Sequence, residues 1–205
     1  MISLNPIYYG RKYLKGYLRL ENNDFFGVDI LNIRCIFNTN NTLLSKIKFN
    51  YILNSLKELP NYILNQLVRY NVKIIFIDDN KMFNLINEQN ILGIYKNNGF
   101  NQVIYINGNQ PLYSLKNSLY HEIGHFIDKC IGDTLNKDSL NSFTDDTLKG
   151  YLLTEINYLS DIYFSRDIQE VFAQIFAEIM QDNKNLISFA PKSCKYILEQ
   201  INLLK

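Results

Sequence analysis

The chain has 205 residues, of which 47% are apolar and 14% aromatic, enough for a sizeable core in a single domain. The formal net charge of +1 argues against a nucleic-acid-binding protein, because such proteins need clustered positive charge to neutralise phosphates. No run approaches the roughly 20 apolar residues of a membrane-spanning helix, and the N-terminus has no signal-peptide pattern. We therefore expect no membrane span and no nucleic-acid partner.

The pattern before residue 112 predicts a mixture of short strands and helices. Alternating or aromatic-rich runs are typical of strands, whereas apolar residues three and four apart are typical of helices. The run Asn97-Asn98-Gly99 favours a hairpin turn. The expected elements are strands at about 13–20 and 28–37 with a turn at 22–24, helices at 42–59 and from Pro60, a strand at 72–77, a short helix to Ile86, and hairpin strands at 91–95 and 102–106.

From residue 112 onward the pattern predicts helices alone. One long helix should run from about Leu112 to Ile131, with Gly132 as its C-terminal stop. Further helices are expected at about 145–158, at 167–181 and from Pro191. These elements predict an α+β fold in one domain, residues 1–205, with an N-terminal lobe to about residue 131 and a helical C-terminal lobe from about 132 to 205.

The three cysteines predict neither disulfides nor a metal cluster. Cys35, Cys130 and Cys194 are odd in number and lack metal-ligand spacing. Cys130 and Cys194 fall in helical apolar patterns, so we expect them to be small core residues.

The expected long helix contains the only two histidines of the chain, in His121-Glu122-Ile123-Gly124-His125. Residues four apart lie on one face of a helix, so both imidazoles can reach one metal ion. Glu122 is offset by one position, which can place its carboxylate beside a water on that ion. This is the H-E-x-x-H arrangement of zinc peptidases. The alternative is a helix with two hydrogen-bonded histidines and a surface glutamate.

Two histidines hold zinc weakly, so a zinc site here needs a third ligand. No other histidine exists, and the ligand must therefore be a carboxylate. Glu170 opens an amphipathic helix in which Ala173 and Ala177 would allow close packing of helices. Its alternative role is a capping box with Asp167. The candidate glutamates on the later helices are Glu155, Glu170 and Glu178.

The segment from His121 to Asp128, followed by Tyr163-x-x-Arg166-x-x-x-Glu170-x-Phe172-Ala173-x-x-Phe176, resembles the catalytic domain of anthrax lethal factor and its relatives, including small secreted Pro-Pro endopeptidases. The similarity covers about Val72 to Met180. It implies a zincin-like metallopeptidase fold, Zn²⁺ as cofactor and Glu170 as the third ligand. The chain lacks that toxin's large binding and translocation domains, and its first 70 residues have no traceable counterpart.

The same resemblance implies a role for Tyr163, which would donate a hydrogen bond to the oxyanion or the leaving amine. With 15 tyrosines in the chain, Tyr158 is an alternative. Asp128 either orients a metal ligand or is a surface acid near the helix end.

These inferences lead to the hypothesis of a zinc endopeptidase that hydrolyses a protein or peptide substrate. Glu122 would be the general base, and the strand Gln102–Ile106 would pair with substrate backbone. The alternatives are a zinc-binding accessory module without turnover and a helical interaction protein without metal. By the resemblance we expect a secreted or toxin-like effector, delivered or extracellular, and otherwise a cytoplasmic protein.

Overall fold

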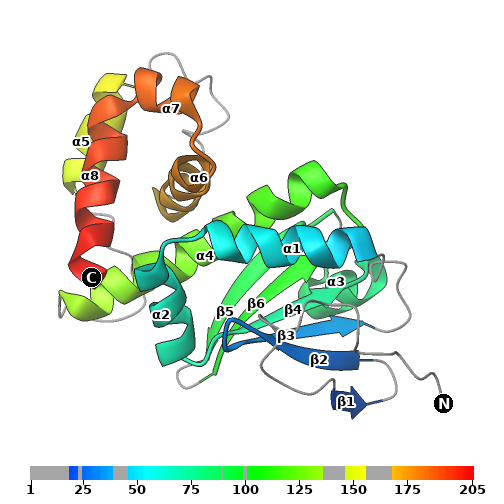
Figure 1. Ribbon diagram of the computed structural model, residues 1–205. Coiled ribbons are helices and arrows are strands. Elements are labelled where there is room, and N and C mark those ends of the chain that lie inside the picture. Colours follow the sequence, from blue (N-terminus) through cyan, green and yellow to red (C-terminus); the bar gives the residue numbers. More distant parts are fainter. Residues whose placement is uncertain are drawn as a thin grey trace. The chain divides into compact units, whose positions relative to one another are not determined.

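The computed structural model describes residues 19–22, 25–38, 46–88, 90–98, 101–135, 146–155 and 168–205 (Figure 1). The expected α+β class is confirmed. The chain divides into two compact units, Met1–Lys116 and Asn117–Lys205. The predicted boundary near residue 131 placed the H-E-x-x-H segment in the N-terminal lobe. The observed boundary, between Lys116 and Asn117, places this segment in the second unit.

The first unit contains a mixed sheet, six-stranded in the described part of the chain, with the strand order β1-β2-β3-β4-β6-β5. The central pairs β3–β4 and β4–β6 are parallel, and the other pairs are antiparallel. The strands are β1 Arg19–Asn22, β2 Phe25–Ile30, β3 Ile33–Asn38, β4 Lys73–Ile77, β5 Gly93–Asn98 and β6 Asn101–Asn107.

The position of β6 contradicts one expectation. Its backbone pairs with β4 on one side and with β5 on the other. The strand Gln102–Ile106 therefore has no open edge with which to pair a substrate. The hairpin that β5 and β6 form is, by contrast, as predicted.

The expected single strand at 28–37 is also wrong, because the chain reverses in its middle. Leu31 and Asn32 have φ angles of 52° and 66°, in the left-handed region, and they join β2 to β3 as an antiparallel hairpin. Leucine disfavours this conformation, so Asn32, which tolerates it, is the only turn former of the pair and gives a weak signal. Strands β1 and β2 pair antiparallel, with Asn22 opposite Phe25, which agrees with the expected reversal, while residues 23 and 24 lie outside the described part of the chain.

One face of the sheet supplies the core of the first unit. Cys35 pairs with Ile74 and Ile74 with Ile104, and all three side chains are fully buried. Beside this row, the rings of Phe37 and Phe76 stack with centroids 4.8 Å apart. Helices α1 Lys46–Glu58 and α2 Asn61–Arg69 add further fully buried side chains, which are Ile52, Leu56, Ile63 and Leu67.

Helix α3, Asp79–Ile86, follows β4 as predicted. Asp78 caps it by accepting a hydrogen bond from the backbone N–H of Lys81 at 2.8 Å. Asn107, at the end of β6, is buried. Its Nδ2 group donates hydrogen bonds to Asp79 Oδ1 and to the backbone carbonyl oxygen of Ile91. These bonds fix the start of α3 to the end of β6.

The second unit is helical in its described residues. Helix α4, Leu112–Thr134, begins in the first unit and continues past Gly132, which was expected to end it. Gly132 is buried within the helix, and burial of a helix turn outweighs the roughly 1 kcal/mol that glycine costs relative to alanine. The other elements are α5 Asp146–Glu155, α6 Ile168–Met180, α7 Lys184–Phe189, α8 Pro191–Ile201 and the 3₁₀ turn η4 Asn202–Leu204.

The three cysteines are buried and free, and the burial of Cys130 and Cys194 confirms their predicted role as core residues. Burial raises the pKa of the Cys194 thiol to about 11, with a smaller contribution from the charge of Glu155. In the described residues, no helix is both long and apolar enough to cross a membrane.

Candidate metal centre

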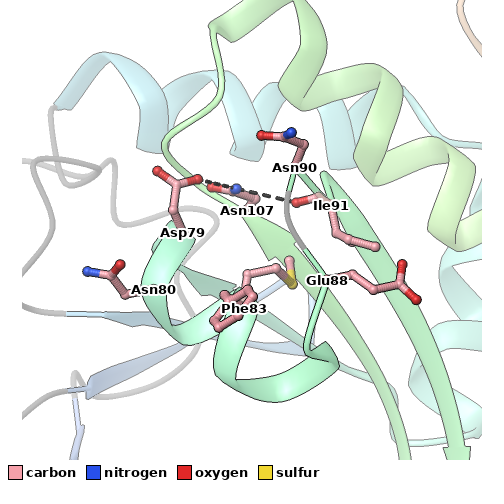
Figure 2. Close-up of a pocket in the computed structure, with 8 residues that line it drawn as sticks. Asp79, Asn80, Phe83, Glu88, Asn90, Ile91 and Asn107 are labelled. Carbon is pink, nitrogen blue, oxygen red and sulfur yellow. Dashed lines mark hydrogen bonds between the residues drawn. The ribbon is translucent and has the colours of Figure 1, made fainter.

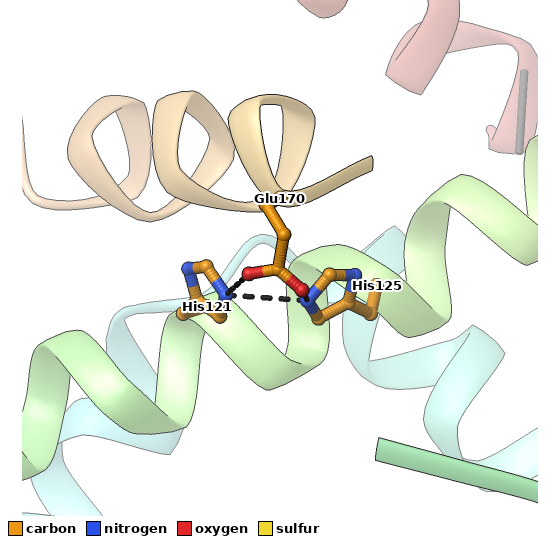
Figure 3. A group of neighbouring side chains, drawn as sticks. All are labelled: His121, His125 and Glu170. Atoms are coloured by element: carbon orange, nitrogen blue, oxygen red, sulfur yellow. Dashed lines mark hydrogen bonds and ion pairs between the residues drawn. The ribbon is translucent and has the colours of Figure 1, made fainter. Parts of the chain in front are cut away.

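Three predicted side chains meet between α6 and the part of α4 that belongs to the second unit (Figure 3). His121 and His125 lie one turn apart on α4, and the carboxylate of Glu170 points from the first turn of α6 toward both rings. One ligand atom from each residue lies within 4.8 Å of the others. In the described ranges, this is the group of histidine, cysteine or acidic residues that could hold a metal ion.

The separations within the cluster suit a tetrahedral ion. The two histidine Nε2 atoms are 3.2 Å apart. Glu170 Oε2 lies 3.1 Å from Nε2 of His121, and Oε1 lies 3.4 Å from Nε2 of His125. Ligand bonds of 2.0–2.2 Å at tetrahedral angles would separate donor atoms by about 3.3–3.5 Å. Two imidazoles and a carboxylate so placed therefore lie within metal-binding distance of one another.

A close approach of the two helices brings Glu170 to the histidines. Gly124 lies between the two histidines in the sequence, and a Cβ at this position would come within 2.8 Å of the Ala173 Cα and 3.0 Å of its carbonyl oxygen. Only glycine on α4, facing a small residue on α6, lets the backbones come this near. The expectation that Ala173 permits close packing is thus confirmed.

The orientation of the His121 ring is set by a residue that the sequence analysis missed. Gln174 Oε1 lies 3.3 Å from His121 Nδ1, and Gln174 Nε2 donates to Glu178 Oε1 at 2.8 Å. A hydrogen bond to the second ring nitrogen is the usual way in which proteins orient a metal-binding histidine. The spacing in the sequence could have indicated Gln174 as a neighbour of the site, because it lies four residues after Glu170 and shares its helix face.

The charges of the cluster are mutually stabilising. Hydrogen bonds from His121 and His125 hold the pKa of Glu170 well below its usual range, although partial burial opposes this shift. Burial lowers the pKa of His125, but the hydrogen bond to Glu170 and the charges of Glu122, Glu170 and Asp128 raise it above its ordinary value. The cluster therefore attracts a positive charge, from a proton or from a metal ion.

Two further acids of α4 are buried beside the cluster. Glu122 is 6% exposed and Asp128 is 3% exposed, and both act electrostatically on His125. The reading of either residue as a surface acid is therefore wrong. Both carboxylates therefore add negative charge beside His125.

The two rival glutamates have other partners. Glu155 accepts hydrogen bonds from the backbone N–H groups of Lys192 and Ser193, at 2.7 and 2.9 Å, in the first turn of α8. Glu178 binds Gln174 and Asn183. Neither belongs to the histidine cluster.

Three residues of the sequence analysis lie outside the described part of the chain, so their predicted roles stay predictions. They are the candidate catalytic Tyr163, its alternative Tyr158 and the expected capping residue Asp167.

A pocket of about 320 Å³ lies in the first unit, beside α3 (Figure 2). Its polar wall includes Asp79, Asn107 and Glu88. Asp79 already accepts hydrogen bonds from Asn109 and Asn107, and these bonds lower its pKa. Asp79 and Asn107 thus take part in the contact of α3 with β6, whereas the cluster of His121, His125 and Glu170 lies in the second unit.

No protein-family model matches the chain, and no curated protein matches it significantly. The evidence for a metal centre is therefore the arrangement of His121, His125 and Glu170 itself.

We predict that Gly124→Ala weakens the site while Gly150→Ala does not. The added methyl at 124 must displace the backbone of α6, and such overpacking costs about 1–3 kcal/mol of unfolding free energy. Gly150, on α5, has nothing within 4 Å of the equivalent position, so alanine there should be neutral or stabilising by about 0.5–1 kcal/mol. Urea denaturation and zinc titration of both variants measure the difference. Equal effects of the two substitutions would contradict the close-approach account.

A second prediction concerns Glu170→Gln in protein kept free of metal by a chelator. The raised pKa of His125 means that its contribution to stability is present below the ordinary value of 6.5 and is lost as pH rises through the folded value. Above 4.5, the ordinary value for Glu170, this carboxylate is ionised in both states. The substitution should therefore destabilise the protein more at about pH 5.5 than at about pH 8.5. A penalty that is larger at the higher pH would show that the two groups do not form this pair.

Proposed function

We propose that the chain is a zinc-dependent endopeptidase of zincin-like fold. The observation that carries the proposal is the convergence of His121, His125 and Glu170 on one point, with Glu122 buried on the adjoining turn of the same helix. A metal held only for structure needs no such base. Three protein ligands with a fourth position left for water are typical of catalytic zinc.

The donor set supports zinc over harder cations. Two imidazole nitrogens and one carboxylate suit Zn²⁺, whereas calcium and magnesium prefer oxygen ligands alone. Zn²⁺ bound here would supply Lewis-acid activation of water and of a peptide carbonyl. His121, His125 and Glu170 would hold it, while Gln174 fixes the ring of His121.

Glu122 is proposed as the general base. Its carboxylate would accept the proton of the attacking water and then deliver this proton to the leaving nitrogen, so that both proton transfers use one group. Its burial excludes bulk water that would compete for the proton. Tyr163 is proposed to donate a hydrogen bond to the charged intermediate, as the motif resemblance implies.

The substrate is proposed to be an extended segment of a protein or peptide. The resemblance to lethal-factor-like peptidases in the segments around His121 and Glu170 supports this class. By the same resemblance, we propose that the chain acts as a secreted or delivered effector. Cleavage near proline is one specificity that the resemblance suggests for testing.

We predict that Glu122→Gln keeps its zinc and loses hydrolysis. The amide has nearly the same shape as the carboxylate but cannot accept the proton, and general acid–base catalysis contributes about 10²–10⁴-fold to rate. A peptide-library digest with and without chelator, followed by mass spectrometry, measures cleavage and residue preference together. Glu199→Gln is the control, because Glu199 is an exposed acid on α8.

Chelator should abolish cleavage by the wild type, and Glu199→Gln should cleave at the wild-type rate. Cleavage by Glu122→Gln at that rate would remove the general-base assignment. Stoichiometric zinc without any cleavage by the wild type would instead favour the accessory-module alternative.

A further inference from the structure

A line of hydrogen bonds leads from the start of α7 to the His121 ring. Asn183 precedes α7, and its Oδ1 accepts hydrogen bonds from the backbone N–H groups of Asn185 at 3.1 Å and Leu186 at 3.4 Å. A backbone N–H can only donate, so the oxygen of the Asn183 amide must face α7. The orientation of this amide is therefore dictated by the backbone, and its nitrogen faces away from α7.

The next two bonds follow from the same donor and acceptor logic. Asn183 Nδ2 donates to Glu178 Oε2 at 2.7 Å, and Glu178 Oε1 accepts from Gln174 Nε2 at 2.8 Å. A carboxylate only accepts hydrogen bonds. Gln174 must therefore turn its nitrogen toward Glu178 and its oxygen toward His121.

The orientation of Gln174 decides which nitrogen of His121 carries the proton. With an acceptor oxygen 3.3 Å from Nδ1, the ring keeps its proton on Nδ1 when a metal ion takes the lone pair of Nε2. Nε2 is the atom that faces Glu170 and His125. A reversed Gln174 would present its NH₂ group to Nδ1 and favour the opposite tautomer, in which a proton occupies the metal-facing nitrogen.

We infer that Glu178 is a positioning residue for the metal centre, which selects the metal-binding tautomer of His121 by fixing the amide of Gln174. This inference rests on the proposed metal site. It assigns Glu178 a role distinct from that of a ligand, since Glu178 acts through Gln174. A second substitution, at position 174, can test this role. The Gln174 amide has one donor end and one acceptor end, so its orientation depends on Glu178. A carboxylate at position 174 would accept from His121 whatever Glu178 did.

This asymmetry defines a double-mutant cycle with four proteins, the wild type, Glu178→Gln, Gln174→Glu and the double variant. The zinc dissociation constant of each is measured by competition with a chromophoric chelator, and the melting temperature of each metal-free protein is recorded. In the wild-type background Glu178→Gln frees Gln174 to reverse, and affinity should fall about tenfold, as is typical when such supporting contacts are lost. In the Gln174→Glu background the same substitution should cause no loss, because it also removes repulsion between carboxylates four residues apart.

If Glu178 had a purely structural role, Glu178→Gln would weaken zinc binding by the same factor in both backgrounds, and that result would overturn the inference. The absence of any effect on zinc binding in either background would also overturn it. ¹⁵N NMR of the zinc-loaded protein gives a second readout. The Nδ1 proton of His121 should be protected from solvent exchange in the wild type and should exchange faster in Glu178→Gln. An unchanged exchange rate in that variant would equally overturn the inference.

The cycle can be interpreted separately from the proposed activity. A wild type that binds zinc but cleaves no peptide would end the peptidase proposal and leave the cycle intact. A wild type that binds zinc with an additive cycle would end only the role of Glu178. A wild type that binds no zinc would end both.

Discussion

The candidate site depends on how closely α6 can approach α4. The histidines are fixed on α4 by their own helical spacing, but the third donor comes from 45 positions farther along the chain, at Glu170. Gly124 and Ala173 together remove the side-chain bulk that would otherwise hold the helices apart. At the other end of α6, the Gln181 amide donates to the side chain of Asn117 on α4 at 3.0 Å. The two contacts fix α6 along its length, and the carboxylate of Glu170 consequently reaches both rings.

Once assembled, the cluster places three electron-pair donors against one another. Their mutual separations of 3.1–3.4 Å are favourable only when a proton or a metal ion lies among them. The buried charges of Glu122 and Asp128 strengthen the preference for a cation. The helices thus provide the geometry, and the surrounding acids provide the electrostatic reason for a metal ion to bind there.

Sequence reasoning identified the parts of this site that depend on local spacing. The H-E-x-x-H pattern places both histidines on one helix face wherever that helix lies, so the pair could be predicted from the sequence alone. The third donor could not be decided by local pattern, because Glu155, Glu170 and Glu178 all lie on helices that follow the histidines and only tertiary packing separates them. Glu155 proves to bind the start of α8, and Glu178 proves to bind Gln174. It was the motif resemblance that favoured Glu170.

The errors in the predicted fold have a related cause. The turn at Leu31 requires a backbone conformation that leucine disfavours, and Gly132 continues a helix because it is buried. Helix α7 spans only Lys184–Phe189, too short for a periodic signal. Each of these features is decided by long-range packing, which a local pattern does not contain.

The most direct test of the account is the zinc content of the purified protein and of two variants. Elemental analysis of the wild type should give about one zinc per chain, as expected for one site with three protein ligands. Glu170→Ala should lose most of this metal, whereas Glu155→Ala should retain it. Wild-type zinc content in Glu170→Ala would contradict the central claim that the carboxylate from α6 completes the site.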